Sequence, residues 1–173
     1  LSSTAGIAIV TIKDFQAHPR IPERNQLLNT DSHEFGHVIG INADAVGNPG
    51  HRYFRLLIDA GPGAACLWLE KDQLYELGIA IQRLLAMIPK YNDRKDPERN
   101  TSIPESAPKS MPSVDFQVET MTMDFDELRN LFMLRVRARE EENSPETKSI
   151  RLWASPPQMK IFSQEALEVC AAG

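Results

Sequence analysis

Basic residues and long apolar runs are scarce in this chain of 173 residues, and each shortage argues against a class of protein. The 19 lysines and arginines are outnumbered by 24 acidic residues, and the net charge of -5 argues against nucleic-acid binding. No apolar run approaches the roughly 20 residues that a membrane-spanning helix needs. The opening "LSSTAGIAIVTIKDF" has no basic residue before its apolar run, unlike a signal peptide. We therefore expect a cytoplasmic protein with no nucleic-acid and no membrane partner.

Cysteines are also few, and both lie among apolar residues. Cys66 is part of an apolar run and Cys170 is on the apolar face of an expected helix, so we expect two buried, reduced thiols. The remaining composition, with 42% hydrophobic and 25% charged residues, is typical of one globular domain. Residues 1–30 stand apart, because a strand-like run at 7–12 is followed by the polar "HPRIPERNQ". We expect residues 1–30 to be peripheral and poorly ordered, and residues 31–173 to form a single α+β domain.

The first half of that domain changes its apolar period from two to about 3.6. Alternation over residues 39–45 and 52–59 predicts two strands, whose inner faces carry Ile39, Ile41, Ala43, Ala45, Phe54, Leu56 and Ile58. The turn "GNPG" joins them, and after "GPG" the run "AACLWLE" predicts a third strand in an antiparallel meander. A helix over residues 71–88 follows, with an apolar face formed by Leu74, Leu77, Ile81, Leu84, Leu85 and Ile88.

The second half repeats this plan after a linker, residues 89–112, that contains five prolines. Strands are predicted in "SVDFQVET", "NLFMLRVRA" and "SIRLWA", and Pro156-Pro157 opens a last helix. Leu67-Trp68 and Leu152-Trp153 lie 85 positions apart, and the same shift superposes four apolar helix positions. The sequence therefore predicts two β-β-β-α pseudo-repeats, residues 36–88 and 113–173, forming a mostly antiparallel sheet system packed by two helices.

Several stretches resemble one bacterial family, catalogued as domain of unknown function 3090. They are "AVGNPGHRYFRLLI", "LWLEKDQL", "FQVETM" and "IRLWASPPQMKIFSQEALEVCAAG", and the resemblance runs from Asp31 to Gly173. It implies the fold and the domain limits, but no activity. Family members commonly continue into a Cys-x-x-Cys segment typical of a zinc site, which this chain lacks. We therefore expect no cofactor in this chain, with zinc confined to such a tail.

The segment His33-Glu34-x-x-His37 has the spelling of a zinc peptidase helix, in which two histidines bind the metal and the glutamate acts as base. The third ligand of the longer pattern would fall at Ala43, which has no donor. The alternation that begins at Ile39 predicts a strand instead, and residues four apart in a strand lie about 13 Å apart. We therefore favour a strand without a metal, and keep a zinc metallopeptidase as the less favoured alternative.

Polar residues at the junction of the third strand and the first helix are candidates for ligand binding. They are Arg52, Glu70, Lys71 and Gln73. The competing interpretation is that Glu70 caps the helix while Lys71 and Arg52 are solvated. Trp68 and Trp153 are expected to pack rather than to hold ligands. For Met121 and Met123, edge packing is favoured over an exposed apolar patch.

These patterns favour a non-catalytic binding or scaffold module with an unidentified protein or small-molecule partner. The alternative is an enzyme of unrecognised type that uses Arg52, Glu70 and Lys71. No glycine elbow, adjacent base or phosphate-binding glycine loop marks a known catalytic class.

Overall fold

The computed structural model describes residues 10–13, 30–88, 113–143 and 146–173. The expected linker 89–112 and most of the expected peripheral segment 1–30 lie outside these residues. Within residues 1–30, the described strand β1 (Val10–Lys13) overlaps the strand-like run at 7–12.

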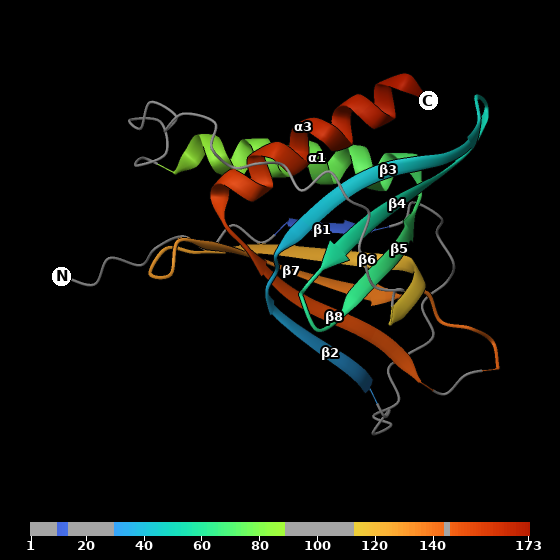
Figure 1. Ribbon diagram of the computed structural model, residues 1–173, viewed down its shortest axis with the longest axis horizontal. Helices are drawn as coiled ribbons and strands as arrows, with labels where there is room; N and C mark the ends of the chain where they lie inside the picture. The colour runs from blue at the N-terminus through green and yellow to red at the C-terminus, as the bar shows by residue number, and fades with distance from the viewer. Residues whose placement is uncertain (1–9, 14–29, 89–112, 144–145) are drawn as a thin grey trace.

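Strands and helices follow in two successive groups (Figure 1). The first group consists of β2 (Thr30–His37), β3 (Gly40–Asn48), β4 (His51–Asp59), β5 (Ala64–Leu69) and α1 (Lys71–Met87). The second consists of β6 (Val114–Asp126), β7 (Leu131–Ala138), β8 (Thr147–Ala154) and α3 (Pro156–Ala172). The orders β3-β4-β5-α1 and β6-β7-β8-α3 match the predicted β-β-β-α units, and the α+β class is confirmed.

The hydrogen-bonded strands follow the order β2-β8-β7-β6-β5-β4-β3, and β1 adds to β6. The first and last strands of this order adjoin in the chain, because only Val38 and Ile39 separate β2 from β3. The Val38 N–H donates to the Trp153 carbonyl (2.9 Å) and the Ile39 N–H to the Asp59 carbonyl (2.7 Å), so pairing continues through this junction. The sheet therefore closes on itself. Most pairs are antiparallel, as predicted, while β2–β8 and β5–β6 are parallel.

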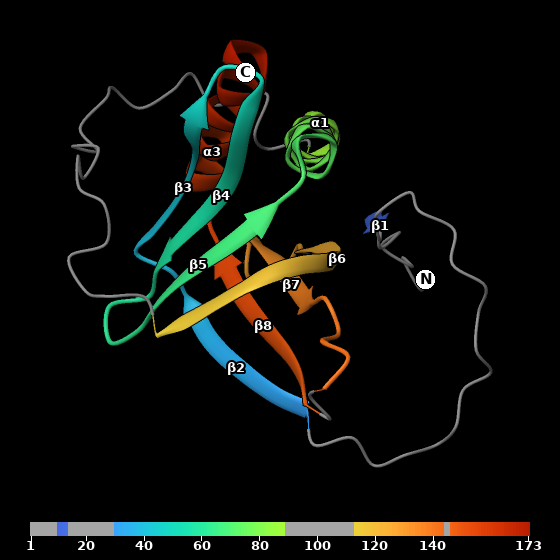
Figure 2. The same ribbon diagram turned by 90° about the vertical axis from the view of Figure 1, so that its right-hand side faces the viewer.

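The interior of the closed sheet is filled by alternate residues of its strands. Alternate residues of β4 and β7 are buried, and for β4 they are the ones predicted on its inner face: Phe54, Leu56, Ile58, Phe132, Leu134 and Val136. Burial of each such side chain stabilises the fold by about 1.5–3 kcal/mol. The helices α1 and α3 pack against each other across one end of the sheet, at the top of Figures 1 and 2.

The helices α1 and α3 begin with the same capping arrangement, and α1 is hydrogen-bonded to a strand of the second half. Each is 17 residues long, and their bounds differ by the 85 positions found in the sequence. Gln73 and Gln158, at the third helical position, close capping boxes with Glu70 and Ser155. The Gln73 amide also donates to the Glu119 carbonyl of β6 (3.3 Å).

In the described part of the chain, no helix is long and apolar enough to cross a membrane.

The junction between β2 and β3 departs from the predicted alternation. Ile39 was expected on an inner face, but it is 60% exposed, and Val38 takes the buried place at 3%. The reason is that Val38 and Ile39 lie between the two strands, and the alternation of β3 begins only at Gly40. The exposed-patch alternative for Met121 and Met123 is wrong, because both side chains are 1% exposed and belong to the core.

Candidate functional site

The His33-Glu34-x-x-His37 segment lies in strand β2, as predicted. Parallel pairing with β8 sets His33 opposite Ile150 and His37 opposite Trp153. A register shift between Glu34 and Gly36 sets the two histidines opposite residues three positions apart on β8, so they do not share one face of a helix as the zinc motif requires. Glu34 is instead ion-paired with Arg151, and the His37 ring is hydrogen-bonded to the Gln158 amide (3.2 Å). Among the described residues, no three His, Cys, Asp or Glu side chains gather in a group that could hold a metal.

The four residues predicted at the strand–helix junction make different contacts. Gln73 accepts a hydrogen bond from the Glu70 N–H (2.9 Å) and is 3% exposed, so this pair forms part of the helix cap. Lys71 is exposed, and its carbonyl accepts from the Cys170 thiol (3.6 Å). Arg52 lies against the C-terminal end of α3, where its Cδ is 3.3 Å from the position that a Cβ on Gly173 would occupy. A ligand site formed by all four stays a prediction.

A different set of side chains meets on the outer face of the sheet, where no sequence pattern had placed a site. Register sets Asp44 of β3 opposite Arg55 of β4, Arg55 opposite Trp68 of β5, and Trp68 opposite Gln117 of β6. These residues form one row across four strands. With their neighbours they form a surface that we name the Trp68 surface, which consists of Asp44, Tyr53, Arg55, Trp68, Asp115 and Gln117.

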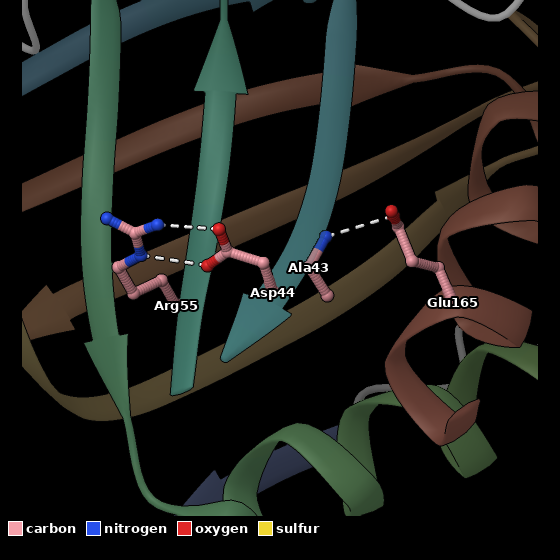
Figure 3. A network of polar contacts seen from close by, with 4 residues as sticks. All are labelled: Ala43, Asp44, Arg55 and Glu165. Atoms are coloured by element: carbon pink, nitrogen blue, oxygen red, sulfur yellow. Dashed lines mark hydrogen bonds and ion pairs between the residues drawn. The ribbon is translucent and has the colours of Figure 1, made fainter. Parts of the chain in front are cut away.

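Arg55 is fixed from two sides within this surface. Its Nε and Nη2 donate to the two carboxylate oxygens of Asp44, at 2.8 and 2.5 Å (Figure 3). Its guanidinium carbon lies 5.5 Å from the centre of the Trp68 ring, within cation–π range. The hydrogen bond with Asp44 raises the pKa of Arg55, so the cation persists at every physiological pH.

The indole N–H of Trp68 is hydrogen-bonded, while part of its ring is exposed. Its indole N–H donates to Asp115 (2.9 Å), and the Tyr53 ring meets it edge-on at 6.5 Å between centroids. Tyr53 itself is 69% exposed, which is unusual for a large ring held beside another. The Gln117 amide reaches Glu70 (3.5 Å), which adds a carboxylate to the rim.

Cys66 lies beside the tryptophan on the same strand and is buried, as predicted, with a free thiol. Burial raises the pKa of the Cys66 thiol, so the thiol stays protonated and is a poor nucleophile. The chemistry that the Trp68 surface offers is therefore contact and charge: two aromatic rings, one neutralised arginine and the carboxylates of Asp115 and Glu70.

The described part of the second half, residues 113–143 and 146–173, differs at the position that corresponds to this surface. At the corresponding position Trp153 is opposed by Met133, where the first half has Arg55. A guanidinium still covers the ring, because Arg129 from the β6–β7 turn lies 5.4 Å from its centroid. Both tryptophans therefore lie half-buried on the outer face, each packed under an arginine.

A small hollow of about 130 Å³ adjoins the Trp68 surface through Gln117. Its lining mixes both signs of charge: Phe116, Gln117, Ala138, Arg139, Glu140, Glu141, Glu146 and Lys148. Small-molecule sites usually occupy about 300–1,000 Å³, so this hollow suits a single side chain rather than a cofactor.

Fold and surface together define an α+β protein of two β-β-β-α units, whose first unit exposes an ordered aromatic and arginine surface. The chain belongs to the family described as "Protein of unknown function (DUF3090)", whose model matches residues 33–173. No curated protein and no solved structure matches the chain.

Proposed function

We propose that this protein is a non-catalytic binding module whose Trp68 surface receives a basic side chain of a protein partner. The observation that supports it is the ordered group of Tyr53, Arg55 and Trp68 on an open sheet face. Tryptophan, tyrosine and arginine are the residues that carry most binding energy at protein interfaces. Because hydrogen bonds and ring contacts already fix Arg55 and Trp68, a partner loses little side-chain entropy in ordering them.

The charge of the surface favours a cationic partner group. Asp44 neutralises Arg55, which leaves Asp115 and Glu70 as the excess charge. A lysine or arginine laid over the exposed Tyr53 ring would gain a cation–π contact and the attraction of these carboxylates. The net charge of -5 adds long-range attraction for such a partner.

A second candidate function is a polar ligand site, or an enzyme of unrecognised type, at Arg52, Glu70 and Lys71. One observation favours it, because the Arg52 Nε is buried without a hydrogen-bond partner among the described residues. An oxyanion would satisfy that donor. Ligand screening by thermal shift, repeated with Arg52→Ala and Lys71→Ala, tests this candidate, and turnover of a ligand would be required before it is called an enzyme.

The proposal places the module in the cytoplasm of a bacterial cell. Cys66 and Cys170 support a cytoplasmic location, because both are free thiols and a reducing compartment keeps thiols reduced. We further propose that the two β-β-β-α units arose by internal duplication, supported by the matching bounds of α1 and α3.

The test uses Trp153→Phe, in which Trp68 is the one remaining tryptophan and reports on its own surface. Titration with an oligolysine peptide is expected to change Trp68 fluorescence, while an oligoglutamate peptide is not. Tyr53→Ala added to this variant is expected to weaken binding of oligolysine about tenfold, as for a central interface residue. Tyr75→Ala is the matched control, because Tyr75 is an exposed tyrosine on α1.

Equal affinities of the Tyr53→Ala and Tyr75→Ala proteins for oligolysine would contradict the proposal. That result would mean that the peptide follows net charge alone and does not use the aromatic surface.

A further inference from the structure

The closed sheet leaves one edge of β6 without a partner from the ring. β6 pairs with β7 along one side, while on the other side β5 reaches only Val114 to Gln117. The next stretch of that side is filled by β1, in antiparallel register from Val10 opposite Met123 to Lys13 opposite Thr120. The edge at residues 120–123 is therefore an acceptor for one short extended strand.

The unpaired edge of β3 is covered by a helix and not by a strand. The backbone N–H of Ala43 donates to the Glu165 carboxylate of α3 at 3.0 Å (Figure 3). α3 packs directly on β3, so the helix covers this edge and satisfies its donor.

The two helices explain why the edges differ. The shift of 85 positions that relates α1 to α3 sets Ala80 at the place of Glu165. Alanine has no side-chain acceptor, and α1 contacts β1 on this side of the molecule. The backbone of β1 pairs with the edge of β6 instead.

The strand that fills the acceptor edge lies outside the part of the chain shared with the family. The family match covers residues 33–173, which include the whole of β6 but not β1. In this chain the acceptor edge therefore lies within the matched region, and the strand that fills it lies outside. Sixteen residues, 14–29, separate β1 from β2 in the sequence, and a chain of that length spans at most about 55 Å.

We propose that the β6 edge at residues 120–123 is a strand-exchange site, through which two copies of this chain trade their β1 strands. A second copy supplies the same Val-Thr-Ile-Lys segment, so all four register pairs are kept in the exchanged dimer. The exchange creates no new edge and loses no backbone hydrogen bond, which makes it a low-cost route to a dimer. This interface is separate from the Trp68 surface, and its test does not depend on the proposed binding function.

The test uses two full-length variants with one added cysteine each, Thr11→Cys and Thr122→Cys, carrying affinity tags of different size. Thr11 and Thr122 are register partners, so their Cα atoms lie about 4.5–5.5 Å apart, within the range of a disulfide. When the two proteins are mixed with oxidised glutathione, a disulfide between them forms only if β1 of one copy occupies β6 of the other. The native thiols are buried at 3% exposure and are common to every sample.

The matched control is Thr11→Cys mixed with Asp126→Cys, which lies four residues further along β6 and about 13 Å from the register position. We expect several-fold more cross-linked heterodimer for the pair 11 and 122 than for the control pair. Mixing is performed with the folded proteins and after joint refolding from urea, since exchange requires β1 to leave its own chain. Equal yields for both pairs after joint refolding would overturn the proposal.

Discussion

Arg55 and Trp68 occupy directly opposed positions on β4 and β5, and the guanidinium carbon lies 5.5 Å from the centre of the indole ring. The same guanidinium is held by both carboxylate oxygens of Asp44 on the other side. An arginine held in this way cannot turn to meet a partner, so it presents a fixed flat face beside the exposed Tyr53 ring.

The pair Asp44–Arg55 is expected to be coupled more strongly than an ordinary surface pair. In a double-mutant cycle of Asp44→Ala and Arg55→Ala, we expect a coupling free energy of about 0.5–1 kcal/mol from urea unfolding. The control cycle uses Glu119 and Arg137, a single-contact pair of 3.1 Å whose arginine is 52% exposed. We expect at most about 0.3 kcal/mol there, and a larger coupling in the control would contradict the claimed order of Arg55.

Glu165 makes the stability of the protein depend on pH in a defined direction. Burial raises the pKa of the Glu165 carboxyl, against the opposing hydrogen bonds from Ala43 and Asn42. The folded-state pKa of Glu165 lies above the unfolded-state value near 4.3. The protonated acid therefore contributes to the free energy of unfolding in full only when the pH is below the unfolded-state pKa. The contribution is lost as pH rises through the folded-state pKa.

The variant Glu165→Gln keeps an acceptor for the Ala43 N–H but cannot ionise. We expect its free energy of unfolding, relative to the natural protein, to increase from about pH 4 upward and to level off above the raised pKa. Urea unfolding across this range measures it. Glu165→Ala is the control, since it also cannot ionise but leaves the N–H without its acceptor, and it is expected to be about 1–3 kcal/mol less stable than Glu165→Gln at every pH. A constant difference between the glutamine variant and the natural protein would be the contrary result.

Local patterns in the sequence were sufficient for the elements and for most of the core. The change of period at Lys71 and the capping residues that precede each helix are local signals, and α1 begins at that residue. The inner face of β4 followed from Phe54, Leu56 and Ile58 for the same reason. Pairing across long separations was beyond these signals. The parallel pairing of β2 with β8 was not predicted, because β2 has no run of alternating apolar residues.

The Trp68 surface was missed because only register assembles it. Asp44, Arg55 and Trp68 come from three strands, and no short motif contains them. One signal was present, since Tyr53 and Arg55 alternate with the inner residues of a predicted strand and so had to face outward. The register of the hairpin "GNPG" would then have set Arg55 opposite Asp44. The predicted group of Arg52 with Glu70 and Lys71 rested on the expected neighbourhood of two strands, and it stays a prediction.

Two glycines of the β3–β4 hairpin are expected to differ in their tolerance of alanine. Gly47 and Gly50 both have positive φ, at 112° and 87°. A Cβ on Gly47 would collide with the carbonyl oxygen of His51, whereas one on Gly50 would meet no atom within 4 Å. We expect Gly50→Ala to lower the free energy of unfolding by about 1 kcal/mol, from backbone strain alone, and Gly47→Ala by more than about 2 kcal/mol. Thermal or urea unfolding measures both, and equal losses would show that the collision at Gly47 is relieved at no cost.

Glu34 is expected to act in structure and not in metal chemistry. It is ion-paired with Arg151 on the neighbouring strand, and the hydrogen bond with Glu34 raises the pKa of Arg151. Because both side chains are partly exposed, Glu34→Gln is expected to lower the free energy of unfolding only slightly, as for a surface ion pair. Added zinc is expected to leave the melting temperature of the natural protein unchanged, since His33 and His37 lie in a strand and not on one helix face, and the His37 ring is hydrogen-bonded to Gln158. A zinc-dependent rise in melting temperature that His33→Ala and His37→Ala each abolish, or zinc-dependent peptidase activity lost in Glu34→Gln, would show that the segment leaves its strand to bind metal.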